Sequence, residues 1–156
     1  FKIDKKNFDI CELLRREIIK FETQIVKKGL NVALEIEDEK MQVFADSDAM
    51  VQVVTNLLGN AIKFTPEKGK ITVKAYNLSD RVNVEIINTG EGIKKEKLKY
   101  IWDRFYKADD SRNQNPEGTG LGLYIVKSII NKSDEKIYVE SVENEFTKFT
   151  FTIKKA

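Results

Sequence analysis

The sequence predicts an α/β fold, a two-layer sandwich in which a mixed sheet of about five main strands carries three main helices on one face. Two observations support this prediction. Apolar residues recur at helical spacing in three segments, and they alternate with polar residues in shorter segments between them. The two patterns interleave in the order helix, strand, helix, strand, strand, helix, strand, strand, which favours helices packed on one face of a sheet.

Capping and breaking residues bound the elements predicted in the first half of the chain. Asp9 and Asp46 can each accept the free amides at the start of a helix, whereas Pro66 has no N–H and ends one. Between the helices, apolar and polar residues alternate as in a half-buried strand. In order, the predicted elements are a helix from Asp9 to Gly29, a strand over 31–37, a shorter extended piece over 43–45, and a helix from Asp46 or Ser47 to about Phe64.

The second half of the chain contains two pairs of predicted strands, separated by a long polar stretch and a helix. The turn-prone residues 77–80 join the first pair. The polar stretch over 88–118 exceeds ordinary connection lengths, which is typical of functional lids or of disordered segments. In order, the predicted elements are strands over 70–76 and 82–87, a short helical patch at about 95–105, a helix over 121–131, and strands over 136–142 and 147–153.

Composition excludes several kinds of chemistry. The 156 residues suit a single domain, 1–156, and they contain one cysteine and no histidine. The chain therefore has no imidazole base, no histidine metal ligand and no histidine that could be phosphorylated. Cys11 alone cannot form an internal disulfide, which fits a reducing compartment. A formal net charge of +2 argues against a broad nucleic-acid-binding surface.

A polar stripe runs along the second predicted helix. Gln52, Asn56, Asn60 and Lys63 are spaced by four, four and three residues, so they share one side of the helix. Such a stripe is either a solvated face or a ligand-binding one. Two asparagines four residues apart lower helix propensity, whereas their amides could ligate Mg²⁺ or donate to phosphate, and the lysine could bind phosphate.

Five of the eight glycines fall in two clusters. Gly90 and Gly92 follow a predicted strand directly, where a polar strand end followed by glycine could meet the edge of a flat base. Gly118, Gly120 and Gly122 open the third helix, whose free amides and dipole suit a polyphosphate. No Gly-Lys-Ser/Thr follows them, and the acidic residue of a dinucleotide-binding unit is absent.

Four motifs in order give a more specific resemblance. The segments 56–66, 88–93, 101–106 and 118–123 resemble the N, G1, F and G2 boxes of the ATP-binding catalytic domain of bacterial sensor histidine kinases. The resemblance extends from about Phe8 to Ile153. It implies the Bergerat fold shared with gyrase, the mismatch-repair ATPases and the heat-shock chaperone, with a long ATP lid over 94–117.

The resemblance also implies roles for individual residues, with ATP and Mg²⁺ as the cofactors. Asn60 would ligate Mg²⁺, and Asn56, Lys63 and Lys107 would act on the phosphates as catalytic residues. The remaining implied cofactor-binding residues are Phe64 and Tyr106 beside the nucleotide, Asn88, Gly90, Gly92 and Ile93 around adenine, and Gly118, Thr119, Gly120, Leu121, Gly122 and Leu123 over the phosphates.

The sequence departs from the family pattern at several positions. Asn88 stands where the family has an aspartate that accepts from the adenine amino group, so we expect ATP binding to persist with lower affinity. Lys107 replaces a common arginine and loses its planar fork. Residues 133–135 replace His-Gly-Gly, and 144–146 replace the glycines before the last strand, so turns at the edge of the sheet should be remodelled.

The family reading places the phosphorylated histidine outside the chain. It would lie on an upstream dimerisation domain, with residues 1–8 as the end of the linker, and a response regulator would be served indirectly. We expect a soluble, monomeric, cytoplasmic fragment of a membrane-anchored homodimer in a two-component system, binding no nucleic acid.

Two alternatives remain open. One is a degenerate nucleotide-binding or docking domain without kinase activity, favoured by Asn88 and Lys107 and opposed by the intact asparagines and glycines. The other is an anti-sigma-factor-like serine kinase or a conformational ATPase. Because the stripe on the second helix contains no carboxylate to activate water, hydrolysis is disfavoured as the main activity.

Overall fold

The computed structural model describes residues 2–106 and 122–156. Their elements are β1 (Lys6–Asp9), α1 (Ile10–Lys20), α2 (Glu22–Lys28), β2 (Asn31–Ile36), β3 (Gln42–Ala45), α3 (Ser47–Phe64), β4 (Lys70–Leu78), β5 (Arg81–Thr89), the 3₁₀ helix η1 (Lys95–Tyr100), α4 (Gly122–Lys132), β6 (Ile137–Val142) and β7 (Phe146–Lys154).

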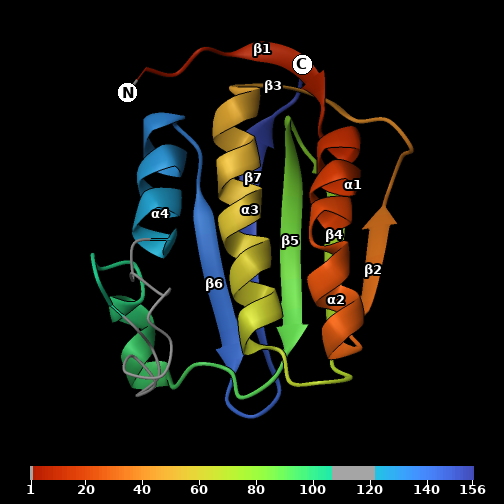
Figure 1. The fold of residues 1–156 in the computed structure, drawn as a ribbon. Helices are drawn as coiled ribbons and strands as arrows, with labels where there is room; N and C mark the ends of the chain where they lie inside the picture. Colours follow the sequence, from red (N-terminus) through yellow and green to blue (C-terminus); the bar gives the residue numbers. More distant parts are fainter. Residues whose placement is uncertain (1, 107–121) are drawn as a thin grey trace.

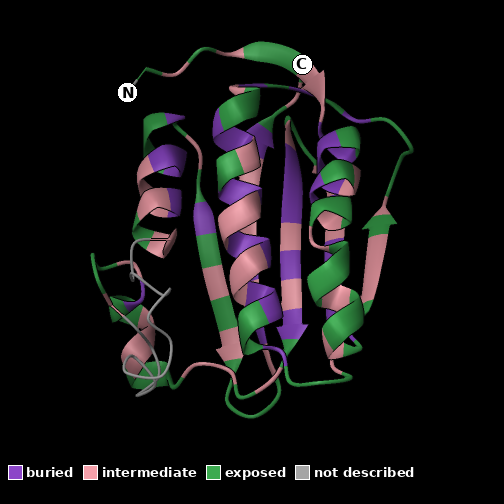
Figure 2. Ribbon diagram, in the orientation of Figure 1, coloured by how far each residue is buried: buried purple, intermediate pink, exposed green. Residues whose placement is uncertain are grey.

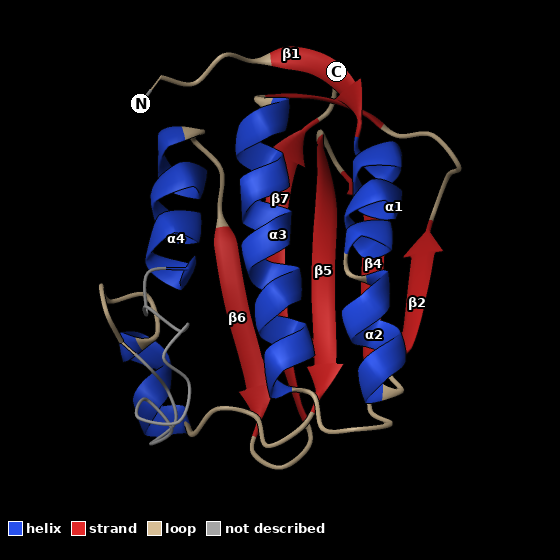
Figure 3. Ribbon diagram, viewed as in Figure 1, coloured by secondary structure: helices blue, strands red, loops and turns tan. Residues whose placement is uncertain are grey.

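The main sheet has five strands in the order β2-β4-β5-β7-β6. β2 pairs in parallel with β4, and the other neighbours are antiparallel, so the sheet is mixed. The helices α1, α2, α3 and α4 all lie on one face of this sheet (Figures 1 and 3). The predicted two-layer α/β sandwich is therefore confirmed.

The core lies between α3 and the inward face of the central strands. Buried residues recur along β4, β5 and β7 and along one side of α3 (Figure 2), and the buried residues of α3 are all apolar. Val84 and Phe151 face each other in register between β5 and β7, and both are fully buried. Burying these large side chains fixes which face of each strand meets α3.

The first predicted helix is in fact two helices, which corrects the single helix expected from Asp9 to Gly29. α1 ends at Lys20, and Phe21 leaves the helical conformation with φ −95° and ψ 6°. A methyl group built on Gly59 of α3 would lie 3.8 Å from the Phe21 ring. Phe21 thus packs where the neighbouring helix has no side chain, and α2 begins at the next residue, Glu22.

The N-terminal residues 1–8, expected to be the end of a linker, include a short strand. Lys6–Asp9 forms β1, an antiparallel partner of β3 in a separate two-stranded sheet. No apolar alternation predicts this strand, since Phe8 is its only apolar residue. The boundary of the domain at residue 8 stays a prediction.

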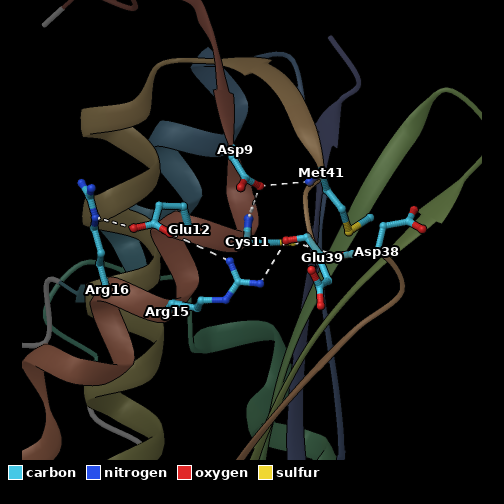
Figure 4. Close-up of polar contacts among 8 residues, drawn as sticks. All are labelled: Asp9, Cys11, Glu12, Arg15, Arg16, Asp38, Glu39 and Met41. Atoms are coloured by element: carbon cyan, nitrogen blue, oxygen red, sulfur yellow. Dashed lines mark hydrogen bonds and ion pairs between the residues drawn. The ribbon is translucent and has the colours of Figure 1, made fainter.

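Asp9 joins this small sheet to α1 (Figure 4). Its Oδ1 accepts from the amide of Cys11 at 3.0 Å and from the amide of Met41 at 2.9 Å. The carboxylate therefore caps α1, as predicted, and also holds the loop before β3. Arg15 supports the same loop by donating to the Glu39 carbonyl oxygen at 3.0 Å.

The two turns at which the sequence analysis expects glycine to be replaced are each built on a residue in the left-handed conformation. Asp134 (φ 58°) follows α4, where Glu135 N–H donates back to the Ile130 carbonyl oxygen at 3.0 Å. Asn144 (φ 65°) makes the turn between β6 and β7. Asp and Asn tolerate this conformation better than most residues, so both turns form without glycine.

Candidate nucleotide-binding site

The polar stripe predicted on the second helix lies on α3. Asn56 and Asn60 are half-buried, whereas Gln52 and Lys63 are exposed. Within the described part of the chain, the side-chain amides of Asn56 and Asn60 make no hydrogen bond. Two half-buried amides without protein partners are available to a ligand.

The start of α4 lies against this stripe. A methyl group built on Gly122, the first residue of α4, would lie 3.8 Å from Asn56 Oδ1. The first amides of a helix have no partner within it and carry the positive end of its dipole. Asn56 and these amides together form a neutral-to-positive end of the site that suits phosphate.

The end of α3 continues the site away from α4. Phe64 is 42% exposed, and Lys63 Nζ lies 5.0 Å from the centre of its ring. At 1.5 Å per residue, Asn56 and Phe64 are about 12 Å apart along the helix. The stripe is therefore long enough to follow an extended ligand from one end to the other.

A row of polar residues crosses the helix-facing side of the sheet at the end of β5. Asn88 of β5 is opposite Thr147 of β7, which is opposite Ser141 of β6. Asn88 is 7% exposed and follows the buried apolar residues of β5. Its Nδ2 donates to the Thr89 carbonyl oxygen at 3.1 Å. This bond directs the amide nitrogen to the backbone and leaves Oδ1 as the acceptor.

Gly90 follows β5 directly and packs closely against the end of α3. It has φ 152°, and a methyl group built on it would lie 2.8 Å from the Phe64 carbonyl oxygen and 3.6 Å from Asn88 Nδ2. Its N–H donates to the Glu145 carbonyl oxygen at 3.2 Å. No larger residue would fit here without displacing the last turn of α3.

The next residues are fastened to the β6–β7 hairpin. Gly92 has φ 69°, and a methyl group built on it would lie 2.5 Å from the Val142 carbonyl oxygen. Ile93 N–H donates to Ser141 Oγ at 2.8 Å, and Ser141 Oγ donates to the Phe146 carbonyl oxygen at 2.7 Å. The predicted adenine segment thus has a defined backbone path.

The segment around η1 packs against α4 and the sheet. Trp102 meets Phe149 edge to face at 5.7 Å between ring centres, with Lys127 Nζ 5.4 Å from the Trp102 ring centre. Arg104 stacks over Tyr124 at 4.9 Å. Tyr106 is half-buried, 6.2 Å from Tyr100 between ring centres. Aromatic and cation–π contacts therefore dock this segment on α4.

Part of the predicted site lies outside the described residues. The structure places the predicted residues on α3, at the end of β5 and directly after it, together with Tyr106, Gly122 and Leu123. Leu123 packs against the core. The predicted residues that fall outside are Lys107, Gly118, Thr119, Gly120 and Leu121, together with the second part of the predicted lid, 107–117.

Sequence reasoning does not identify two residues that shape the site. Ser141 anchors Ile93 from 48 residues away, so no local pattern reveals it. Thr65 is 1% exposed, and its Oγ1 donates to the Ala61 carbonyl oxygen at 2.5 Å, which stabilises the end of α3. Its position directly before Pro66 could have suggested a helix-ending role.

A family model described as histidine kinase-, DNA gyrase B- and HSP90-like ATPase matches residues 45–156. The solved nucleotide-free catalytic domain of histidine kinase ThkA is 33% identical, with a TM-score of 0.86 over 97% of this chain and 96% of that chain. A chain from the solved complex of ThkA with response regulator protein TrrA is 30% identical, with a TM-score of 0.83 over 99% of this chain and 42% of that chain.

The adaptive-response sensory kinase SasA of Synechocystis sp. is 32% identical over 98% of this chain and 40% of the SasA sequence. The chain spans 33 to 40% of the length of the SasA proteins that it matches. These similarities confirm the family to which the four sequence motifs point. The chain belongs to the histidine kinase-, DNA gyrase B- and HSP90-like ATPases, as a histidine kinase ATP-binding catalytic domain.

Proposed function

We propose that this chain binds ATP together with Mg²⁺ and transfers the γ-phosphoryl group to a histidine on a separate dimerisation domain. The proposal rests on three features of the site: the unpaired side-chain amides of Asn56 and Asn60 on α3, the N-terminus of α4 beside Asn56, and the acceptor oxygen of Asn88 at the end of β5. Phosphoryl transfer depends mainly on positioning and charge neutralisation, which such a site can supply. The chain itself contains no histidine to accept the group.

In this proposal the residues divide the ligand between them. Asn56, Lys63 and the amides at the start of α4 hold the phosphates, and Lys107 and 118–123 complete that end. Asn88 Oδ1 accepts from the adenine amino group, while Gly90, Gly92 and Ile93 line the base and Phe64 and Tyr106 flank the nucleotide. The half-buried and unpaired state of Asn56 supports the first assignment, and the amide orientation of Asn88 supports the second.

The α3 stripe fits Mg²⁺ that arrives with a nucleotide better than Mg²⁺ alone. Among residues 2–106 and 122–156, no group of three or more His, Cys, Asp or Glu side chains could hold a metal ion. Asn60 offers one neutral oxygen, and Mg²⁺ commonly keeps waters and substrate phosphates as its other ligands. Asn60 would hold the ion, which when bound neutralises charge on the phosphates.

Calorimetry with MgATP tests this proposal. The wild-type chain should bind MgATP, N60A should bind it more weakly, and Mg²⁺ alone should give no measurable binding. Q52A is the matched control, because Gln52 lies on the same side of α3 but is exposed and one turn before Asn56. The absence of wild-type binding at millimolar MgATP, or equal losses in N60A and Q52A, would contradict the proposed site.

The proposal extends to the protein from which the chain comes. In the solved ThkA complex, a related kinase is bound to a response regulator protein, and we propose a response regulator as the final acceptor here too. We also propose that the parent is a membrane-anchored homodimer with this domain in the cytoplasm. In the described ranges, no helix has both the length and the apolar character needed to cross a membrane.

One observation favours a second function, nucleotide binding without phosphoryl transfer. Asn88 is a neutral acceptor at a buried position, so it forms a weaker bond to an amino group than a carboxylate does. A chain that binds MgATP but supports no transfer to a histidine would fit this second function.

A further inference from the structure

One side chain fastens the end of α2 to the end of α3. Lys28, the last residue of α2, donates from its ammonium group to the carbonyl oxygens of Ile62 at 2.7 Å and Lys63 at 3.1 Å. The last carbonyls of a helix have no partner within it. The usual donor to Ile62 would be the amide of residue 66, which is Pro66 and has no N–H. The Lys28 ammonium replaces the donor that proline lacks.

The backbone of the same residue holds the loop after α3. Lys68 N–H donates to the Lys28 carbonyl oxygen at 3.0 Å. Lys28 therefore binds both sides of the α3–β4 connection, with its side chain on the helix end and its carbonyl on the loop. Burial lowers the pKa of Lys28 below its ordinary value. The negative charge of Glu67 favours the charged form and so opposes part of that shift.

The segment that Lys28 holds is in contact with the adenine side of the proposed site. The Phe64 carbonyl oxygen would lie 2.8 Å from a methyl group built on Gly90, and Pro66 Cδ would lie 3.5 Å from it. Gly90 in turn lies beside Asn88 Nδ2, at 3.6 Å from the same built atom. A shift of the last turn of α3 would therefore change the spacing of Phe64, Gly90 and Asn88.

We propose that Lys28 is a positioning residue for the nucleotide site, which it shapes by holding the last turn of α3 against Gly90. This inference rests on the proposed function, because it assigns Lys28 to the same site. Lys28 does not contact the ligand: its ammonium group is occupied by the two carbonyl oxygens of α3. Its effect reaches the nucleotide through the positions of Phe64 and Gly90.

Three substitutions separate positioning from a general loss of charge or stability. K28M keeps the aliphatic stem and removes the ammonium group, K28R keeps a charged donor, and K28Q keeps a neutral one. K27M is the matched control, because Lys27 is the preceding residue of α2, is exposed, and makes no hydrogen bond or ion pair within the described residues. Affinity for MgATP is measured at a temperature at which every variant is folded.

We expect K28M to raise the Kd for MgATP by about fivefold, K28Q by less, and K28R and K27M by under about twofold. Without ligand, the Gly90 amide resonance should shift in K28M and stay in place in K27M. K28Q provides the same comparison if K28M does not fold. Wild-type affinity in K28M and K28Q, or K28R as weak as K28M, would overturn the role of Lys28. Failure of the wild type itself to bind MgATP would instead overturn the proposed function, and the two failures are therefore distinguishable.

Discussion

Replacing Asn88 by aspartate separates the affinity of the site from the stability of the domain. Asn88 is 7% exposed, and its Nδ2 donates to the Thr89 carbonyl oxygen at 3.1 Å. In N88D, this bond is lost and a carboxylate oxygen faces the carbonyl. The lost bond costs about 1 kcal/mol, and burying the charge beside an acceptor adds to it, so we expect the free domain to lose about 1–3 kcal/mol of stability.

Nucleotide binding should change in the opposite direction. A carboxylate accepts from the adenine amino group by a charge-assisted bond, which is worth about 1 kcal/mol more than a neutral one. This difference corresponds to roughly a fivefold lower Kd for MgATP in N88D. Thermal unfolding of the free chain measures the first effect, and calorimetry with MgATP measures the second.

The matched control is N83D, on the same strand. Asn83 is also 7% exposed, but it lies on the opposite face of β5 from Asn88. N83D should lose stability without any gain in affinity. Weaker binding of MgATP by N88D than by the wild type, or a gain in affinity in N83D equal to that in N88D, would contradict the assignment of Asn88 to adenine.

Four further predictions concern the framework of the domain. G92A should lose about 2–4 kcal/mol of stability, because Gly92 has φ 69° and the added methyl would lie 2.5 Å from the Val142 carbonyl oxygen. G59A in α3 should instead gain about 0.5–1 kcal/mol of stability, since the added methyl group makes only ordinary van der Waals contacts. Chemical denaturation compares G92A with G59A, and an equal loss of stability in both would contradict this expectation. D46A should lose about 1–2 kcal/mol, because Asp46 accepts from the Ala49 amide at the start of α3 and from the Asp4 amide. The hydrogen bond from the Asp4 amide, and then the one from the Ala49 amide, lower the pKa of Asp46 below its ordinary value of 3.8. The stability difference between D46A and the wild type is therefore full above about pH 4 and shrinks as pH falls through the lowered pKa. A stability difference that grew in acid would contradict this. Cys11 should react only slowly with a thiol reagent at pH 8 until denaturant is added. Burial, and then the charge of Asp9, raise the pKa of the Cys11 thiol to about 11. Rapid labelling of the folded chain would contradict the burial of Cys11.

Local patterns predict much of this fold because they act over one or two turns of chain. Asp9 and Asp46 cap α1 and α3 as predicted, through bonds to amides two and three residues away. Pro66 stops α3 near the expected residue, with Thr65 extended. The break at Phe21 has no local signal of this kind, and the Phe21 ring packs beside Gly59 on another helix.

Sequence patterns that act over a few residues also cannot identify every residue that shapes the site. The motifs point to Asn56 and Asn88 because both stand at motif positions that can be read along the chain, and their contacts with a nucleotide stay a prediction. Ser141 and Lys28 act on residues 48 and 34 positions away, so only the folded chain brings them to the site. β1 is missed for a related reason, since its polar sequence forms a strand only because β3 lies beside it.

In the proposed function, this domain holds ATP and directs its γ-phosphoryl group to a histidine that the chain does not contain. The most direct test of this function joins the chain to its natural histidine-bearing region and adds ATP labelled at the γ-phosphate, with the 156-residue chain alone as the control. The account predicts label that is labile in acid and stable in alkali on the joined protein, and none of that kind on the control. Label stable in acid, or MgATP binding without any label on the joined protein, would contradict it.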